Sequence, residues 1–179
     1  MENNENGCIP KLDNLLTTEE INKSNNINKI TDKIYLGDEE GAKELDYFKT
    51  EQIHYVLSIV KNPPTHPEEM NIKLMHLDID ESLTTNISYY TKQCINFIEN
   101  ADKIYIHCTC GINRSAAVVI GYLMWKTHSD YDEVFNYVKQ RRDYIQPINP
   151  FIVQLNKFHK LLKNNDYNLE KIVINKKTK

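Results

Sequence analysis

The chain has 179 residues, 40% of them hydrophobic, which is enough for one domain with a buried core. Its 22 Lys and Arg residues against 25 Asp and Glu residues give a net charge of −3, which excludes binding to nucleic acid or a membrane surface through bulk positive charge. The sequence contains no apolar run of about 18 residues, so we expect no transmembrane helix.

The first 27 residues are polar and rich in Asn, Glu, Lys and Thr. This composition predicts a disordered tail, in which LDNLLTTEEI can form a short helix capped by Thr17 or Thr18. The four cysteines, Cys8, Cys94, Cys108 and Cys110, fit neither a disulfide framework nor the Cys/His spacing of a zinc site. We therefore expect a reducing, cytoplasmic environment, with the nucleus as a second location, and no metal or other cofactor.

The apolar patterns that follow alternate between strands and helices. Short β-branched or alternating runs predict strands at 32–37, 55–60, 72–79 and 103–107. Apolar residues at helical spacing predict helices at 38–51, 86–100, 113–125, 130–142 and 150–162. The helix at 113–125 is apolar almost all round, which predicts that it is buried at the centre of the fold.

Helix-capping signals support two of these helices. Asp130 with Glu133 three residues later matches a capping box, and Pro150 behind Asn149 suits the first position of the last helix. The pattern predicts an α/β fold with a central mixed, twisted β-sheet flanked by helices on both faces. We place the folded domain at 28–164, between an N-terminal tail (1–27) and a basic C-terminal tail (165–179).

One stretch, HCTCGINRSAAVV (107–119), carries most of the chemical information. A strand, a loop with Gly111 and a helix N-terminus together suit an anion, because the first turn of a helix has unpaired N–H groups and a partial positive charge. Arg114 stands at the helix start, where its planar guanidinium can bind two phosphate oxygens. Residues 108–114, here called the signature loop, are therefore predicted to bind phosphate.

Cys108 opens the signature loop and is the predicted nucleophile. A free cysteine has a pKa of about 8.5, which helix N-termini and nearby cations lower to roughly 3.5–7.5. The features that would hold phosphate would thus also keep Cys108 as a thiolate. The Ser115 hydroxyl is placed to hydrogen-bond the sulfur when it leaves.

The stretch HCTCGINRS, followed by AAVVIGYLM, resembles the signature of the Cys-dependent protein phosphatases, and the short dual-specificity branch fits best. The similarity covers about Ile30 to Leu162, and no kinase-docking domain fits in the 27-residue head, so we expect an atypical, stand-alone member of that family. The resemblance implies roles for Cys108 as nucleophile, Arg114 as phosphate clamp and Ser115 as helper for thiolate departure.

The resemblance also assigns the remaining residues of the motif. The backbone N–H groups of the loop would bind the phosphoryl oxygens, and His107 would orient the loop from below. The phosphate-binding residues are then His107, Thr109, Cys110, Gly111, Ile112, Asn113 and Arg114.

The general acid is the open point. The family places an Asp before the helix at 86–100, and this chain offers HLDIDES there. Counting back without a gap reaches Glu81, and a shift of one residue reaches Asp80. We favour Asp80 over Glu81, with Asp78 third, and either carboxylic acid can protonate a leaving oxygen. The family also often has Pro-Asn before its last helix, where this chain has Ile148.

Four functions fit this motif. The first is a phosphatase of phosphotyrosine and phosphoserine/threonine in proteins. The second is an RNA 5′-phosphatase, because Thr109 and Asn113 resemble the loop of those enzymes. Only under this second function would nucleic acid be a partner. A phospho-binding scaffold with little turnover is the third, and sulfur transfer by a rhodanese-like loop a distant fourth. The uncharged loop positions disfavour inositol lipids, and we expect phosphoprotein partners and no membrane.

Overall fold

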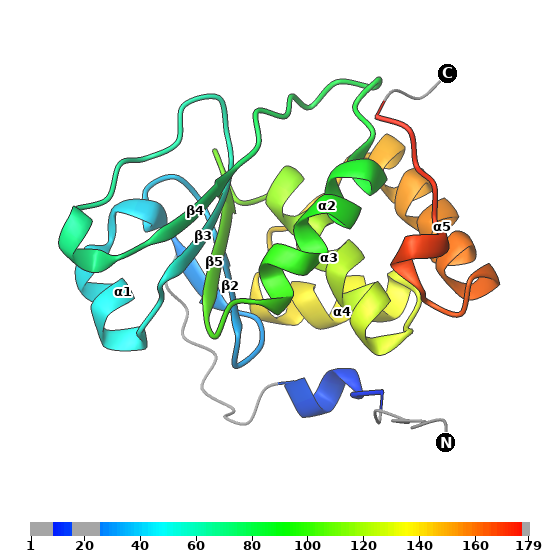
Figure 1. Ribbon diagram of the computed structural model, residues 1–179, viewed down its shortest axis with the longest axis horizontal. Helices are drawn as coiled ribbons and strands as arrows, with labels where there is room; N and C mark the ends of the chain where they lie inside the picture. Colours follow the sequence, from blue (N-terminus) through cyan, green and yellow to red (C-terminus); the bar gives the residue numbers. More distant parts are fainter. Residues whose placement is uncertain (1–8, 16–25, 177–179) are drawn as a thin grey trace.

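A five-stranded sheet carries the fold in a computed structural model that describes residues 9–15 and 26–176 (Figure 1). The strand order is β1-β2-β5-β3-β4, with β1 antiparallel to β2 and all other neighbours parallel. The strands are β1 (Ile27–Lys29), β2 (Ile34–Gly37), β3 (Tyr55–Ile59), β4 (Lys73–His76) and β5 (Ile104–Cys108). The expected mixed sheet is confirmed, with β1 as a strand that the sequence patterns did not predict.

Helices cover both faces of the sheet, as expected. On one face lies α1 (Leu45–Glu51), and the other four pack together on the opposite face (Figure 1). They are α2 (Ile87–Glu99), α3 (Arg114–Thr127), α4 (Tyr131–Arg141) and α5 (Asn149–Asn164). The predicted helix at 38–51 is shorter than expected, because a 3-10 turn at Gly41–Lys43 precedes α1 and Glu44 leaves the helical conformation.

The central helix is α3, whose residues from Ser115 to Met124 are all buried. It packs so closely that a Cβ added at Gly121 would lie 2.6 Å from Cγ2 of Thr91 in α2 and 2.9 Å from Cδ2 of Leu155 in α5. The prediction of a buried central helix is confirmed. Because α3 follows β5 directly, this packing fixes the position of the signature loop between them.

The two predicted caps have different outcomes. Asp130 and Glu133 form the capping box of α4. The predicted cap of α5 is wrong: Ile148 is the N-cap, Asn149 is the first helical residue and Pro150 follows it. Ile148 is extended, with φ −66° and ψ 151°, and its N–H bonds to the Asn113 side chain in the signature loop.

Residues outside the predicted domain limits of 28–164 also pack on the core. The 3-10 turn Leu12–Leu15 is tied to the body by the N–H of Asp32, which donates to the Leu15 carbonyl at 2.8 Å. Beyond α5, Ile172 is buried, and another 3-10 turn forms at Leu169–Lys171. The predicted cap at Thr17 or Thr18 and the head cysteine Cys8 lie outside the described residues.

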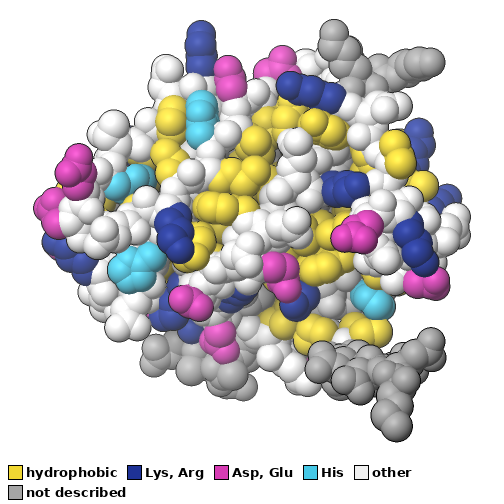
Figure 2. Space-filling view, in the orientation of Figure 1, with side chains coloured by type: hydrophobic (Ala, Val, Ile, Leu, Met, Phe, Trp, Pro, Cys, Tyr) yellow, Lys and Arg dark blue, Asp and Glu magenta, His cyan; other side chains and the backbone are white. Residues whose placement is uncertain are grey.

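The surface in Figure 2 carries Lys and Arg side chains interspersed with Asp and Glu side chains. This mixture agrees with the near-zero net charge of the chain. Within residues 9–15 and 26–176, the helices are all too short or too polar to cross a membrane.

Candidate active site

The signature loop lies at the carboxyl end of β5, where the first turn of α3 begins at Arg114. Gly111 has φ +63°, the left-handed region that favours glycine. A Cβ there would lie 2.4 Å from both the Gly37 carbonyl oxygen and Nη2 of Arg142. Gly111 is therefore required by backbone conformation and by the close approach of β2.

The carbonyl oxygens of residues 109–112 are held by the surrounding protein. Those of Thr109 and Ile112 accept from the N–H groups of Glu39 and Gln146, at 3.3 and 2.8 Å. Those of Cys110 and Gly111 accept from Arg142 at 3.4 and 2.8 Å. In the described chain, the N–H groups of residues 109–114 donate to no backbone carbonyl. Fixing the carbonyls outward leaves these N–H groups for an anion, as the sequence predicts.

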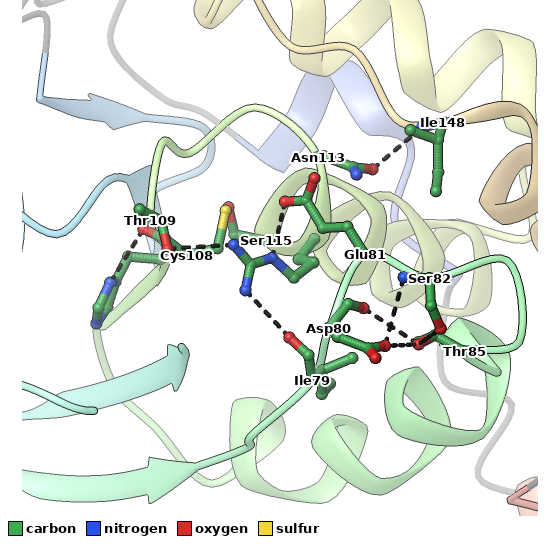
Figure 3. Close-up of polar contacts among 12 residues, drawn as sticks. Ile79, Asp80, Glu81, Ser82, Thr85, Cys108, Thr109, Asn113, Ser115 and Ile148 are labelled. Atoms are coloured by element: carbon green, nitrogen blue, oxygen red, sulfur yellow. Dashed lines mark hydrogen bonds and ion pairs between the residues drawn. The ribbon is translucent and has the colours of Figure 1, made fainter. Parts of the chain in front are cut away.

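Cys108 is 1% exposed and lines a pocket of about 460 Å³ at this loop. The Ser115 hydroxyl donates to its sulfur at 3.2 Å (Figure 3). The pocket is lined by Glu81, Cys108, Cys110, Ile112, Asn113, Gln146, Pro147, Ile148 and Asn149. The structure thus joins the predicted nucleophile to its predicted hydroxyl helper.

Arg114 points back across the loop rather than into solvent. Its Nη2 donates to the Thr109 hydroxyl at 3.1 Å and its Nη1 to the Ile79 carbonyl at 3.0 Å. Its Nε donates to Oε1 of Glu81 at 2.9 Å (Figure 3). Three fixed partners hold the guanidinium in one orientation beside the pocket, which is the arrangement a phosphate clamp needs.

The two favoured acids lie on the acid loop (residues 77–85), and they point in different directions (Figure 3). The Asp80 carboxylate accepts from the Thr85 hydroxyl and from the Ser82 N–H, and the Thr85 bond, with that of Ser82, lowers the pKa of Asp80. Glu81 instead lines the pocket and pairs with Arg114. The preference for Asp80 remains a prediction, but this geometry favours Glu81. Asp78 is exposed and does not line the pocket.

His107 lies below the loop, in the sheet, as the resemblance implies. Its side chain is fully buried, its ring stacks on Tyr105 with centroids 5.5 Å apart, and Nδ1 lies 3.4 Å from the Cys108 carbonyl oxygen. Burial lowers the pKa of His107 from 6.5 to about 4. His107 is therefore a neutral structural support at neutral pH.

Arg142, at the end of α4, is a functional residue that the sequence analysis missed. Its side chain is completely buried; besides the Gly111 carbonyl, it reaches Oδ1 of Asn28 at 2.6 Å and Oδ2 of Asp38 at 3.9 Å. It thereby connects the loop to β1 and to the end of β2. The pattern QRR did contain it, but nothing in the sequence distinguishes the fully buried arginine from its half-buried neighbour Arg141.

The last support comes from the segment before α5. The Ile148 N–H donates to Oδ1 of Asn113 at 3.1 Å, and the Gln146 N–H holds the Ile112 carbonyl. This backbone donor supports the loop at the position where the family often carries Asn. Cys110 is exposed at the rim. In the described part of the chain, we find no group of three or more His, Cys, Asp or Glu residues suited to a metal ion.

A search of protein-family models matches residues 34–161 to "Dual specificity phosphatase, catalytic domain". The chain belongs to the dual-specificity phosphatase family. The match spans β2 to α5 and includes the whole signature loop.

Relatives with curated names agree with this family. The chain is 32% identical over 135 residues to MAP kinase phosphatase with leucine-rich repeats protein 1 of Dictyostelium discoideum, covering 73% of this chain and 16% of that protein. It is 30% identical over 129 residues to human dual specificity protein phosphatase 1, covering 70% of this chain and 35% of the relative. The chain therefore spans less than two thirds of either relative's length.

Solved structures of the family share the fold. The crystal structure of DUSP15 superposes with a TM-score of 0.75 at 27% identity, covering 83% of this chain and 97% of that one. A human tyrosine phosphatase-like serine/threonine/tyrosine-interacting protein gives a TM-score of 0.72 at 25% identity, covering 78% and 99%. The fold class expected from the sequence is confirmed.

Proposed function

We propose that this dual-specificity phosphatase family member hydrolyses phosphotyrosine and phosphoserine/phosphothreonine in proteins through a phosphocysteine intermediate. The observation that carries the proposal is the contact of the Ser115 hydroxyl with the Cys108 sulfur, at 3.2 Å, beside loop residues 109–112, whose carbonyl oxygens bond to the surrounding protein. A sulfur atom in that position can attack a phosphorus atom whose oxygens bind the loop N–H groups and Arg114.

The first step forms the S–P bond and breaks the P–O bond to the substrate. The Cys108 thiolate supplies the electron pair, and the leaving oxygen takes a proton from the acid loop, for which Glu81 has the better position. The substrate hydroxyl is then free to leave. Arg114 and the loop N–H groups stabilise the charge on the phosphoryl oxygens.

The second step forms a new P–O bond to water and breaks the S–P bond. The carboxylate left on the acid loop accepts a proton from the attacking water, inorganic phosphate forms, and the electron pair returns to sulfur. The Ser115 hydroxyl stabilises the departing thiolate through its hydrogen bond. We therefore expect Ser115→Ala to slow this step and to accumulate phosphocysteine in a rapid-quench experiment.

The other candidates have weaker support. The interspersed charges in Figure 2 provide no continuous basic track for RNA on that face, and the family relatives carry protein phosphatase names. A scaffold without turnover would not need the Ser115 contact to Cys108. Phosphoprotein substrates thus fit best, in a cytoplasmic or nuclear setting.

The deciding experiment compares Cys108→Ser with Cys110→Ser, its neighbour in the same loop. Each protein is assayed on a phosphotyrosine peptide, a phosphothreonine peptide and 5′-triphosphate RNA. We expect Cys108→Ser to abolish turnover while still binding phosphate, Cys110→Ser to remain active, and vanadate to inhibit the parent enzyme. Turnover by Cys108→Ser near the parent rate would refute the phosphocysteine route, and preference for RNA would replace the substrate class.

A further inference from the structure

The acid loop ends at the first turn of α2, and one side chain of α5 bonds to both sides of that junction. Oε1 of Gln154 accepts the N–H of Ile87 at 2.8 Å, and its Nε2 donates to the Thr85 carbonyl at 2.9 Å. A backbone N–H can only donate and a carbonyl can only accept, so these partners fix the orientation of the amide. Gln154 therefore bridges the last residue of the acid loop and the first residue of α2.

The junction that Gln154 bridges is shielded from water. Thr85 and Ser88, on either side of it, are 8% and 6% exposed, and the Ser88 hydroxyl donates to the main-chain carbonyl of Gln154 at 3.0 Å. The Ile87 N–H is one of the first-turn donors that a helix cannot satisfy from within. Because a buried polar group that loses its partner costs free energy, the junction favours the arrangement that Gln154 satisfies.

The position of Thr85 affects both candidate acids. Its hydroxyl donates to the Asp80 carboxylate, as Figure 3 shows. The next residue, Glu81, lines the pocket and pairs with Nε of Arg114. A shift of Thr85 would therefore move either carboxyl group relative to the pocket.

Helix α5 also holds the signature loop. Its N-cap residue, Ile148, donates its N–H to Oδ1 of Asn113 at 3.1 Å. Gln154 follows six residues later, roughly 9 Å along the helix axis. The helix itself packs on α2 and α3 (Figure 1). One rigid element thus contacts the loop that carries the nucleophile and the loop that carries the acid.

We propose that Gln154 is a positioning residue for the general acid: by holding the Thr85 carbonyl from α5, it sets where the acid loop lies relative to Cys108. The inference rests on the proposed phosphatase function, and it applies whether Glu81 or Asp80 gives the proton. Proton transfer needs the acid within hydrogen-bonding reach of the leaving oxygen, and small misplacements of a reacting group are costly. Loss of the bond should therefore slow the substrates that need a proton and spare those that do not.

The test compares Gln154→Met, which keeps the length of the side chain but neither hydrogen bond, with Asn156→Met, which replaces an exposed carboxamide on the same helix. In Gln154→Met we expect kcat on an alkyl phosphate to fall about tenfold and kcat on an activated aryl phosphate to change less than about twofold. Vanadate inhibition should not weaken, because the signature loop is untouched. Asn156→Met should keep both parent rates.

Gln154→Glu separates the two hydrogen bonds. Its carboxylate still accepts from the Ile87 N–H, at the positive end of α2, but cannot donate to the Thr85 carbonyl. Hydrogen exchange of the Ile87 N–H should be faster than in the parent for Gln154→Met and near the parent rate for Gln154→Glu. Both variants should nevertheless lose the alkyl phosphate rate. A parent-like alkyl rate in Gln154→Glu would show that the Thr85 bond does not position the acid.

The remaining outcomes separate this proposal from a general structural role and from the proposed function. Equal falls in the alkyl and aryl rates of Gln154→Met, with weaker vanadate inhibition, would mean that Gln154 supports the whole site, which overturns the proposal. A parent-like ratio of the two rates in that variant also overturns it, while the phosphatase function stands. If the parent enzyme hydrolyses neither substrate, the proposed function fails and the positioning role fails with it.

Discussion

Oε1 of Glu81 lies 2.9 Å from Nε of Arg114, so the acid loop and the signature loop meet in an ion pair at the pocket. The Ile79 carbonyl, two residues earlier, accepts from the same guanidinium at 3.0 Å. A phosphate group that binds Arg114 through Nε must compete with the Glu81 carboxylate for that donor. The ion pair therefore links substrate binding to the position and protonation of the acid.

Glu81→Gln should accordingly have opposite effects on binding and on turnover. Removal of the negative charge should tighten vanadate or phosphate binding by up to about fivefold, which corresponds to about 1 kcal/mol, the upper range for a partly exposed charge pair. Hydrolysis of an alkyl phosphate, whose leaving group needs a proton, should fall about 10²-fold or more, while an activated aryl phosphate should change far less. The inhibition constants of vanadate and phosphate measure the effect on binding, and kcat on the alkyl and aryl phosphates measures the effect on turnover.

The matched control is Asp80→Asn, one residue away. The Asp80 carboxylate accepts hydrogen bonds from the Thr85 hydroxyl and the Ser82 N–H. Its replacement should therefore leave the ratio of alkyl phosphate to aryl phosphate hydrolysis rates near that of the parent enzyme. A collapse of the alkyl phosphate rate in Asp80→Asn, with Glu81→Gln near normal, would restore Asp80 as the acid. If neither variant changes that rate, Asp78 becomes the next candidate.

Arg114→Lys keeps the positive charge but loses the planar fork. A single ammonium cannot maintain the bonds to Ile79, Thr109 and Glu81 in the present geometry. We expect kcat/KM to fall at least about tenfold, which corresponds to roughly 1.4 kcal/mol of transition-state stabilisation. Unchanged kinetics would mean that the guanidinium does not contact the phosphoryl group.

Arg142→Met should destabilise the protein and loosen the signature loop together. The methionine retains much of the apolar stem but leaves the Gly111 carbonyl and the Asn28 side chain without a buried charged donor. We expect the free energy of unfolding to fall by about 2–4 kcal/mol, measured by urea denaturation, with a parallel loss of kcat/KM. Arg141→Met is the control, because Arg141 bonds to Tyr137 within α4. Equal effects of the two variants would contradict a specific role for Arg142.

Much of the fold was predictable because hydrophobic periodicity is a local signal. The apolar residues all round α3 and the short apolar run of β5 are adjacent in the chain, and these predictions are confirmed. The strand β1, only three residues long, carries no such pattern and forms because Ile27 finds a partner in Gly37. The start of α5 was misplaced for the same reason, since the decisive bond of Ile148 goes to Asn113, 35 residues away.

The candidate site shows the same difference between residues placed by local sequence and residues placed by long-range contacts. Cys108 and Ser115 lie in one continuous motif, so their contact could be anticipated from the sequence and the resemblance. The identity of the acid depends on the conformation of the acid loop. In that loop the Thr85 hydroxyl donates a hydrogen bond to the Asp80 carboxylate, which the spacing of residues in the sequence does not reveal. Arg142 approaches the loop from another helix, and only tertiary structure brings it there.

Charge around the pocket predicts a preference among peptide substrates. Acidic residues follow two of the parallel strands that end beside the signature loop: Asp38 and Glu39 after β2, and Asp80 and Glu81 after β4. The Glu39 N–H bonds directly to the Thr109 carbonyl of the loop. A phosphopeptide with flanking Lys or Arg residues should therefore have a higher kcat/KM than one with flanking Asp or Glu.

The comparison uses one phosphotyrosine peptide with either three flanking lysines or three flanking glutamates. We expect a difference of about threefold to tenfold at low salt, disappearing near 1 M salt, where the Debye length is about 3 Å. A matched variant, Glu39→Gln, should reduce the difference. A preference for the acidic peptide would show that the field of these carboxylates does not act on the substrate.

The burial of His107 predicts how stability depends on pH. The pKa of His107 falls from 6.5 to about 4 on folding, so between these values the unfolded chain binds a proton that the folded chain does not. Folding is then not penalised above pH 6.5, and the free energy of unfolding decreases as the pH falls from 6.5 toward 4. The shift corresponds to a loss of about 3 kcal/mol across that window. Other histidines contribute to the pH dependence too, since burial also lowers the pKa values of His128 and His159.

Urea denaturation of the parent protein and of His107→Gln at pH 7.5, 6.0 and 4.5 isolates the contribution of His107. The variant should be less stable than the parent at pH 7.5, but it should lose less stability on acidification. Identical pH slopes in the two proteins would show that His107 takes up its proton as readily in the folded chain as in the unfolded one.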